Sequence, residues 1–197
     1  MAPQQDTVIR HAVIDRLFHW ITAAIMTVLL ATSLLPIIGV RFGWYTIHWV
    51  SGLLLTVIIL LHVLRALFWQ RPATMLALQS GDLTARGAGK YTLPQKLMHL
   101  AWTVAILVAI VTGLLLLQKA GVPFLARDPY ASSPATWGFL TLLHDLAALL
   151  SVFLILVHVY FGLLPEKRAY LRAMVSGRIT RSELAAEHDL TRVERGD

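Results

Sequence analysis

The stretch that decides the fold is Trp137–Pro165, which reads WGFLTLLHDLAALLSVFLILVHVYFGLLP. A helix needs about 20 apolar residues to cross the hydrocarbon core of a membrane, and this stretch is longer than that. It contains two histidines, His144 and His158, fourteen residues apart. Fourteen residues are close to four helical turns, so both imidazoles leave the same face of the helix at depths about 21 Å apart. The stretch therefore predicts a membrane span that presents two imidazoles on one face.

The composition of the whole chain agrees with a membrane protein. Of its 197 residues, 57% are hydrophobic and only 14% are charged, a balance that soluble domains rarely show. The absence of cysteine excludes disulfides, thiolate metal sites, iron–sulfur clusters and covalently attached haem. A metal centre would therefore rest on histidine. The basic residues behind the net charge of +6 flank apolar runs, which favours lipid head groups over nucleic acid as their partners.

The chain contains four apolar runs that are long enough to span a membrane. We place them at Leu17–Ile38, Ile47–Trp69, Leu97–Leu117 and Phe139–Leu164. Fourteen of the 17 Lys and Arg residues lie on the side of both termini, so the positive-inside rule puts both termini in the cytoplasm. The predicted fold is an all-α integral membrane protein with a bundle of four transmembrane helices.

A change in composition after Pro165 predicts a domain boundary. Residues 1–165 are expected to form the membrane domain, and residues 166–197 a basic cytoplasmic tail. Within the tail we expect short helices over Ala169–Val175 and Arg178–Glu187.

The two halves of the membrane domain resemble each other. The first span opens with RLFHW, which carries His19, and the third opens with KLMHL, which carries His99. The second and fourth spans each carry two histidines fourteen residues apart. Both halves begin on the cytoplasmic side, so we interpret the bundle as two similar hairpins related by a parallel repeat. Such a repeat places the second and fourth spans across from each other.

The histidines of the spans fall at two depths. The outer level holds His48 and His144, and the inner level holds His19, His62, His99 and His158. An imidazole in lipid needs a partner, and six rings at matched depths favour metal ligation over six unrelated hydrogen bonds between helices. Facing histidines without thiolates, and with one neighbouring carboxylate, Asp145, suit haem iron better than zinc. We therefore predict two haem b groups, one near each membrane face.

Other residues are candidates for the haem surroundings. Gly52 lies one turn after His48, where a missing side chain leaves room for a flat macrocycle or for close helix packing. Arg16 and Arg65 lie at the inner ends of spans and would meet either haem propionates or lipid phosphates. An alternative function is that of a metal or proton transporter that uses the same histidines. Such a transporter would be expected to have more carboxylates within the spans.

Four motifs in order resemble the cytochrome b subunit of respiratory formate dehydrogenases, and more widely the hydrogenase-type di-haem cytochromes b. They are VIDRLFHW at Val13–Trp20, the His48–Gly52 pair leading to Arg65, GKYTLPQK at Gly89–Lys96 before a Thr112–Gly113 pair, and His144 and His158 before AMVSGRITR.

This resemblance implies axial pairs His48–His144 for the outer haem and His19–His158 for the inner one. It further implies a bacterial inner-membrane subunit that takes electrons from an iron–sulfur subunit of a catalytic dehydrogenase. The chain's own chemistry would then be electron transfer and the reduction of a quinone, either ubiquinone or menaquinone, without catalytic residues of its own. Thr92 and Gln95 match the segment that helps to bind quinone in this family, although Thr92 replaces a common asparagine.

The inner haem has competing ligands. The fourteen-residue spacing and the repeat favour His62 opposite His158, and His99 lies at the same level, whereas the family pattern favours His19.

Overall fold

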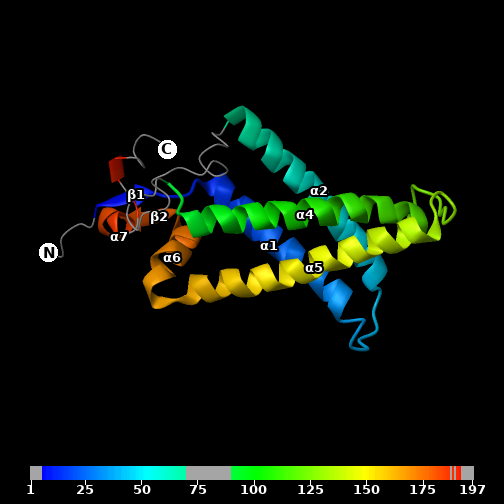
Figure 1. Cartoon of the computed structure of the whole chain (residues 1–197). Helices are drawn as coiled ribbons and strands as arrows, with labels where there is room; N and C mark the ends of the chain where they lie inside the picture. The colour runs from blue at the N-terminus through cyan, green and yellow to red at the C-terminus, as the bar shows by residue number, and fades with distance from the viewer. Residues whose placement is uncertain (1–5, 70–89, 187, 189, 192–197) are drawn as a thin grey trace. The chain divides into compact units, whose positions relative to one another are not determined.

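Four long helices dominate the fold in a computed structural model, which describes residues 6–69, 90–186, 188, 190 and 191. Each is long and apolar enough to cross a membrane, which confirms the predicted four-span fold (Figure 1). Their bounds are Val13–Leu34 for α1, Trp44–Trp69 for α2, Leu93–Ala120 for α4 and Pro134–Leu163 for α5.

The helices do not end where the apolar runs end. Among the C-terminal ends the largest difference is at α1, which stops at Leu34 although the apolar run continues to Ile38. Pro36 cannot continue a helix, and the chain turns through Gly39, whose φ is 90°. The N–H of Gly39 donates to the carbonyl of Pro36 at 3.1 Å. Local backbone chemistry therefore sets this end of the helix, not hydropathy.

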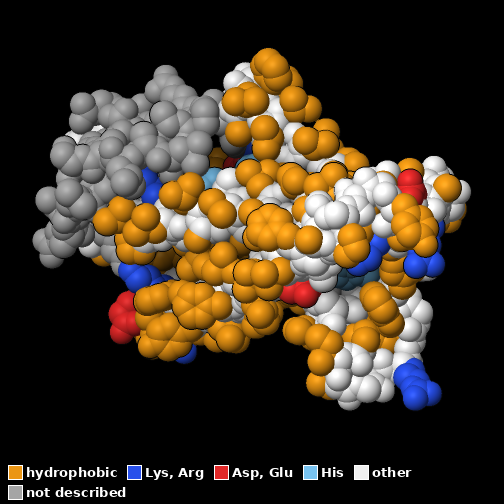
Figure 2. Space-filling model, turned by 45° about the vertical axis from the view of Figure 1, so that its right-hand side comes forward, with side chains coloured by type: hydrophobic (Ala, Val, Ile, Leu, Met, Phe, Trp, Pro, Cys, Tyr) orange, Lys and Arg blue, Asp and Glu red, His pale blue; other side chains and the backbone are white. Residues whose placement is uncertain are grey.

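Apolar side chains make up much of the visible surface, interspersed with other side chains and backbone (Figure 2). Few residues of each span are buried inside the protein, between 6% and 17% of the most apolar window. Several hydroxyls inside the spans bond their own helix: Ser151, for example, donates to the carbonyl of Ala147 at 2.8 Å. Helices suit lipid because their backbone polar groups are bonded within the helix.

The chain divides into two compact units, and every long helix contributes to both. The first unit comprises Met1–Trp20, His62–Leu100 and Leu156–Asp197, and the second comprises Ile21–Leu61 and Ala101–Ile155. The core of the second unit contains Ile25 and Met26 of α1, Leu55 of α2 and Ile106 of α4. Residues 70–89 of the first unit and residues 192–197 of the predicted tail lie outside the described residues.

The first unit contains a small sheet beside short helices. Strand β1 (Thr7–Ile9) pairs antiparallel with β2 (Arg178–Thr180), with Val8 opposite Ile179. After α5 follow the 3-10 helix η2 (Pro165–Lys167), α6 (Arg168–Ser176) and α7 (Arg181–Ala185). Ala173, Ile179 and Leu184 form the core under this sheet.

This sheet corrects one prediction. The helix expected over Arg178–Glu187 is wrong for its first three residues, which form β2. Two neighbours explain the strand: Gly177 ends α6 in the left-handed conformation, and Ile179 is β-branched and fully buried. The expected helix over Ala169–Val175 is present as α6.

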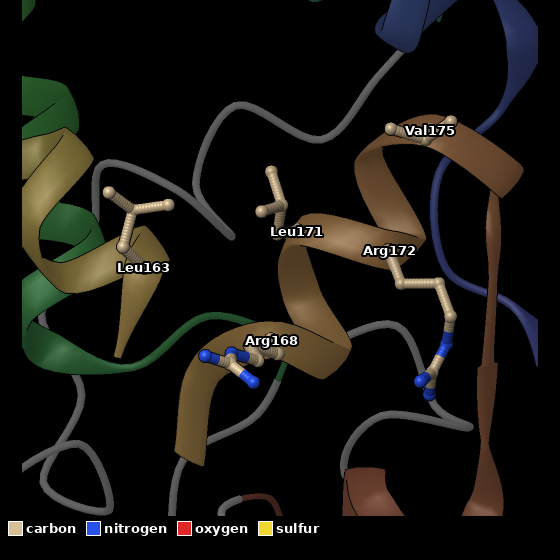
Figure 3. Close-up of a pocket in the computed structure, with 5 residues that line it drawn as sticks. All are labelled: Leu163, Arg168, Leu171, Arg172 and Val175. Carbon is tan, nitrogen blue, oxygen red and sulfur yellow. The ribbon is translucent and has the colours of Figure 1, made fainter. Parts of the chain in front are cut away.

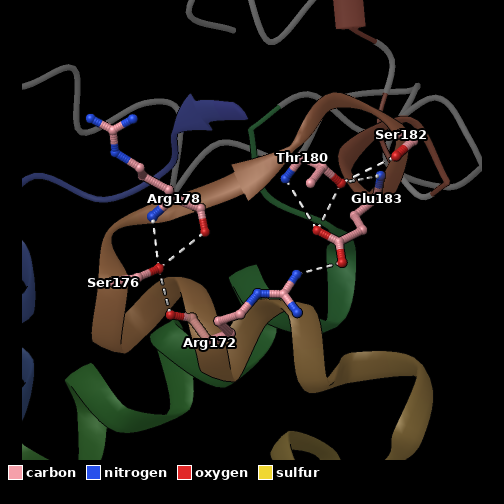
Figure 4. Close-up of polar contacts among 6 residues, drawn as sticks. All are labelled: Arg172, Ser176, Arg178, Thr180, Ser182 and Glu183. Atoms are coloured by element: carbon pink, nitrogen blue, oxygen red, sulfur yellow. Dashed lines mark hydrogen bonds and ion pairs between the residues drawn. The ribbon is translucent and has the colours of Figure 1, made fainter. Parts of the chain in front are cut away.

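A capping box starts α7 (Figure 4). The hydroxyl of Thr180 accepts from the N–H of Glu183 at 3.2 Å, and the Glu183 carboxylate accepts from the N–H of Thr180 at 3.1 Å. The same carboxylate pairs with Arg172 of α6 at 2.5 Å. These bonds, of which the one from Arg172 has the largest effect, lower the pKa of Glu183 to about 2. Glu183 is therefore ionised at neutral pH, and its ion pair with Arg172 links α7 to α6.

Replacing Gly177 by alanine is expected to destabilise the first unit by about 1–2 kcal/mol, because φ is 84° at this position. The new Cβ would also lie 3.0 Å from the carbonyl oxygen of His11 and 3.2 Å from the guanidinium carbon of Arg16. Thermal unfolding in detergent measures the loss. Gly138→Ala is the control, because a Cβ there meets no described atom within 4 Å. Equal midpoints for the two variants would contradict the expectation.

The stability of the first unit is expected to rise with pH between about 4 and 6.5. Burial, and then the charges of Arg10 and Lys90, lower the pKa of His11 to about 4 from its usual 6.5. In this pH range His11 is protonated in the unfolded chain but not in the folded chain. This difference lowers the free energy of unfolding by about 2 kcal/mol at pH 4, after allowing for partial exposure. Unfolding in detergent across this range measures the slope. His11→Gln should flatten it, and an unchanged slope in that variant would refute the assignment to His11.

Candidate metal-binding sites

The second unit brings the rings of His48 of α2 and His144 of α5 close together, in an edge-on arrangement. Their ring centroids are 6.2 Å apart, with an angle of 73° between the ring planes. Both side chains are half-buried. These are the two histidines that the sequence analysis assigned to one level.

A threonine hydroxyl lies within hydrogen-bond distance of each ring of this pair. The Thr32 hydroxyl of α1 lies 2.9 Å from Nδ1 of His48, and the Thr112 hydroxyl of α4 lies 2.9 Å from Nδ1 of His144. Both threonines are buried, with 3% of each residue exposed. Four helices thus contribute one polar side chain each to a single site.

Two glycines leave space around this pair. A Cβ placed on Gly113 would lie 3.1 Å from Cε1 of His144, so a larger residue there would push the ring away from its present place. A Cβ placed on Gly52 would meet no described atom within 4 Å, so this position is open. The role of Gly52 beside a haem stays a prediction.

The first unit brings His19 of α1 and His158 of α5 together. Their ring centroids are 6.0 Å apart, with 47° between the planes. The indole of Trp20 stands edge-on to His19 at 5.0 Å and donates to the carbonyl of Met174 at 3.1 Å. Within the described part of the chain, the buried Nδ1 of His19 has no hydrogen-bond partner.

The other two histidines of the spans take different places in this unit. His62 of α2 stacks on Phe18, with ring centroids 4.0 Å apart and 14° between the planes. His99 lies on α4 within the same unit. The pairing of His158 with His19, and not with His62, is the arrangement that the family pattern implies. Which of these residues bind iron stays a prediction.

The two arginines predicted beside the haems both have protein partners. Arg16 donates to the carbonyl of Val175 at the end of α6. Arg65 of α2 forms an ion pair with Asp15 of α1 at 2.5 Å. Contacts of either arginine with haem propionates stay predictions.

The predicted quinone residues lie at the start of α4. The side-chain oxygen of Gln95 accepts from the N–H of Thr92 at 3.0 Å, as in a helix cap. Thr92 precedes the first residue of the helix, and Gln95 is its third residue. Their local role is therefore to begin α4, and their binding of quinone stays a prediction.

A surface groove of about 600 Å³ lies in the first unit. It is lined by Leu163, Arg168, Leu171, Arg172 and Val175, at the end of α5 and along α6 (Figure 3). Arg172 is already paired with Glu183. The groove has no histidine in its lining, so it does not belong to the candidate metal sites.

The separation of the rings tests whether each pair fits an iron with two axial imidazoles. Two bonds of about 2 Å, plus about 1 Å from each nitrogen to its ring centre, give a centroid separation of about 6 Å. The observed values of 6.0 and 6.2 Å fit this geometry. In the described ranges, no cluster of three His, Asp or Glu side chains suits a bare metal ion. The residues present therefore fit haem.

The sequence pattern gave Thr32 no role and named Thr112 only as the neighbour of Gly113. Thr32 follows His19 by thirteen residues, and Thr112 follows His99 by the same distance. This repeat is the signal in the sequence that points to them. It is a weak signal, because both spans contain other threonines and a threonine in a span usually bonds its own helix.

Comparison with known families agrees with this geometry. A sequence model of the family described as prokaryotic cytochrome b561 matches residues 10–177, which include both histidine pairs and both threonines. No curated protein matches the chain. Four apolar helices and facing histidine pairs accord with membrane proteins that bind haem b and transfer electrons. The chain belongs to the prokaryotic cytochrome b561 family.

Proposed function

We propose that this multi-pass membrane protein is the di-haem electron-transfer subunit of a respiratory dehydrogenase complex of the formate dehydrogenase type. It would carry electrons from an iron–sulfur subunit on the periplasmic side to a quinone near the cytoplasmic side of a bacterial inner membrane. The observation that carries this proposal is the presence of two facing histidine pairs, with centroid separations of 6.2 and 6.0 Å.

The chain's own residues would do three things. His48 and His144 would hold one haem b, and His19 and His158 would hold the other. Haem b supplies one-electron chemistry when it is bound. In a membrane the apolar helices would keep water from both pairs, and burial is one of the factors that set a haem potential. Two centres at different depths suit a membrane core of about 30 Å, which is too thick for one fast electron step.

The proposed direction rests on charge and resemblance. Lys and Arg residues concentrate on the side of the termini, which favours a cytoplasmic location for the His19–His158 pair. Thr92 and Gln95, in the same unit as this pair, are the proposed quinone contacts. Quinone reduction there would take protons from the cytoplasm, so turnover would move charge across the membrane.

Two alternatives use the same residues. A cytochrome b subunit of another oxidoreductase, such as hydrogenase, needs the same two haem sites and differs in its catalytic partner. A metal or proton transporter needs polar groups along a path. It is less well supported, because the described part of the chain has no cluster of three ligands for a metal ion.

The test uses the complex as it exists in native membranes. The chain would be tagged and purified in mild detergent with its associated subunits, and formate or hydrogen would be supplied as electron donor. We expect formate to reduce both haems and a soluble quinone analogue to reoxidise them. Reduction by hydrogen alone would identify the hydrogenase-type alternative. Haems that neither donor reduces, or that quinone does not reoxidise, would contradict the proposal.

A further inference from the structure

We propose that Thr32 and Thr112 are positioning residues that fix the imidazoles of His48 and His144 for iron and lower the midpoint potential of the haem between them. This inference rests on the proposed binding of haem by that pair. It assigns a function to the hydroxyls of two residues that are each only 3% exposed.

The first step concerns the single proton of each hydroxyl. Thr32 lies 2.8 Å from the carbonyl oxygen of Val28 in its own helix, and Thr112 lies 2.6 Å from that of Val108. A carbonyl oxygen only accepts, so each hydroxyl can direct its proton to its own helix. The oxygen of each threonine is then left to accept a hydrogen bond.

The second step fixes the imidazole tautomers. Nδ1 of His48 and Nδ1 of His144 each lie 2.9 Å from a threonine oxygen whose proton is directed to its own helix. In this arrangement both Nδ1 atoms carry the hydrogen and donate it to the threonine oxygens. The lone pair of each neutral ring is then on Nε2, which becomes the available iron ligand.

The third step concerns the orientation of the ring. Gly113 directly follows Thr112, and even a Cβ at Gly113 would press on His144 at 3.1 Å. The Cε1 and Nδ1 side of the ring thus lies close to α4, with Nδ1 2.9 Å from the neighbouring hydroxyl. Bond and packing together hold one orientation of His144.

The fourth step links the bond to the potential. An imidazole that donates its Nδ1–H to an acceptor is a more basic ligand, which stabilises ferric over ferrous iron. Both ligands of the His48–His144 pair make this bond, whereas Nδ1 of His19 has no hydrogen-bond partner among the described residues. The threonines therefore favour a lower potential at the His48–His144 haem. This order makes transfer towards the His19–His158 haem downhill, as the proposed direction requires.

The experiment replaces the threonines in the complete, haem-loaded complex. Thr32→Val and Thr112→Val keep the shape of the side chain and remove the acceptor, and Thr32→Ser and Thr112→Ser restore it. Thr27→Val is the matched control, because Thr27 of α1 bonds the carbonyl of Ala23 and, in the part of the chain that the structure describes, no histidine. Redox titration gives both midpoint potentials, and electron paramagnetic resonance reports the orientation of the axial ligands.

We expect each valine variant to shift one midpoint potential to a more positive value and to change one low-spin signal. The double variant should shift it further, and the serine variants should return both readouts to those of the wild type. Where a valine variant loses that haem, serine should retain it. Serine and valine variants that behave alike, or potentials unchanged in all variants, would overturn the inference while leaving the proposed function intact. A wild-type complex without b haem would instead refute the proposed function.

Discussion

Replacing His144 by alanine is expected to halve the haem content, from two haems per chain to one. The facing ring, His48, lies 6.2 Å away by centroid and is the second ligand expected at that site. One imidazole cannot make both axial bonds, so His48→Ala should give the same loss. The other pair, His19 and His158, has its own two rings in the first unit and should keep its haem.

Haem per protein, measured by extraction and absorbance, checks this expectation. His188→Ala is the control, since His188 is a histidine outside the spans whose Nε2 lies 3.1 Å from the hydroxyl of Tyr170. It should retain both haems. Full haem content in His144→Ala would show that this pair does not hold haem.

Alanine variants of His19 and His62 are expected to differ in haem content. His19→Ala is expected to lose the haem of the first unit, because the centroid of its ring lies 6.0 Å from that of His158. His62→Ala should keep both haems, because the His62 ring lies flat against Phe18 in the same unit. Loss of the stacked ring would cost some stability of the first unit rather than a ligand.

The measurement is again haem per protein, together with the potential of the haem that remains in each variant. The potential shows which of the two haems has gone, because His19→Ala should retain the one that Thr32 and Thr112 lower. The assignment of His19 fails if His62→Ala loses a haem while His19→Ala keeps both.

The four spans were predictable from the sequence because lipid imposes a simple rule. A helix buried in hydrocarbon must be apolar for about 20 residues, and Trp137–Pro165 meets that rule without any knowledge of its neighbours. The helix ends were less predictable. Pro36 stops α1 four residues before the apolar run ends, and the turn through Gly39 follows local backbone chemistry.

The small sheet was not predictable in the same way. β1 and β2 are each three residues long and come from opposite ends of the sequence. Neither strand has enough alternation to stand out, and their pairing depends on tertiary contacts under Ile179. The N-terminal segment thereby joins the tail in one unit, which composition alone did not indicate.

The histidine pairs were partly predictable. Helical periodicity put His48 and His144 at one level, and the structure brings their rings together. Periodicity also favoured His62 as the mate of His158, but the structure stacks His62 on Phe18. Spacing along one helix gives depth but does not say which neighbouring helix faces the ring. The threonine contacts depend on that same neighbour relation, so sequence spacing could suggest them only through the repeat of Thr32 and Thr112.

The most direct test of the central claim is the haem stoichiometry of the purified wild-type chain, from its reduced-minus-oxidised spectrum and its protein content. Two facing pairs predict two b haems per chain, with two separate midpoint potentials. A purified protein without b-type bands would contradict the account, and a single haem per chain would show that one of the two pairs does not hold the cofactor.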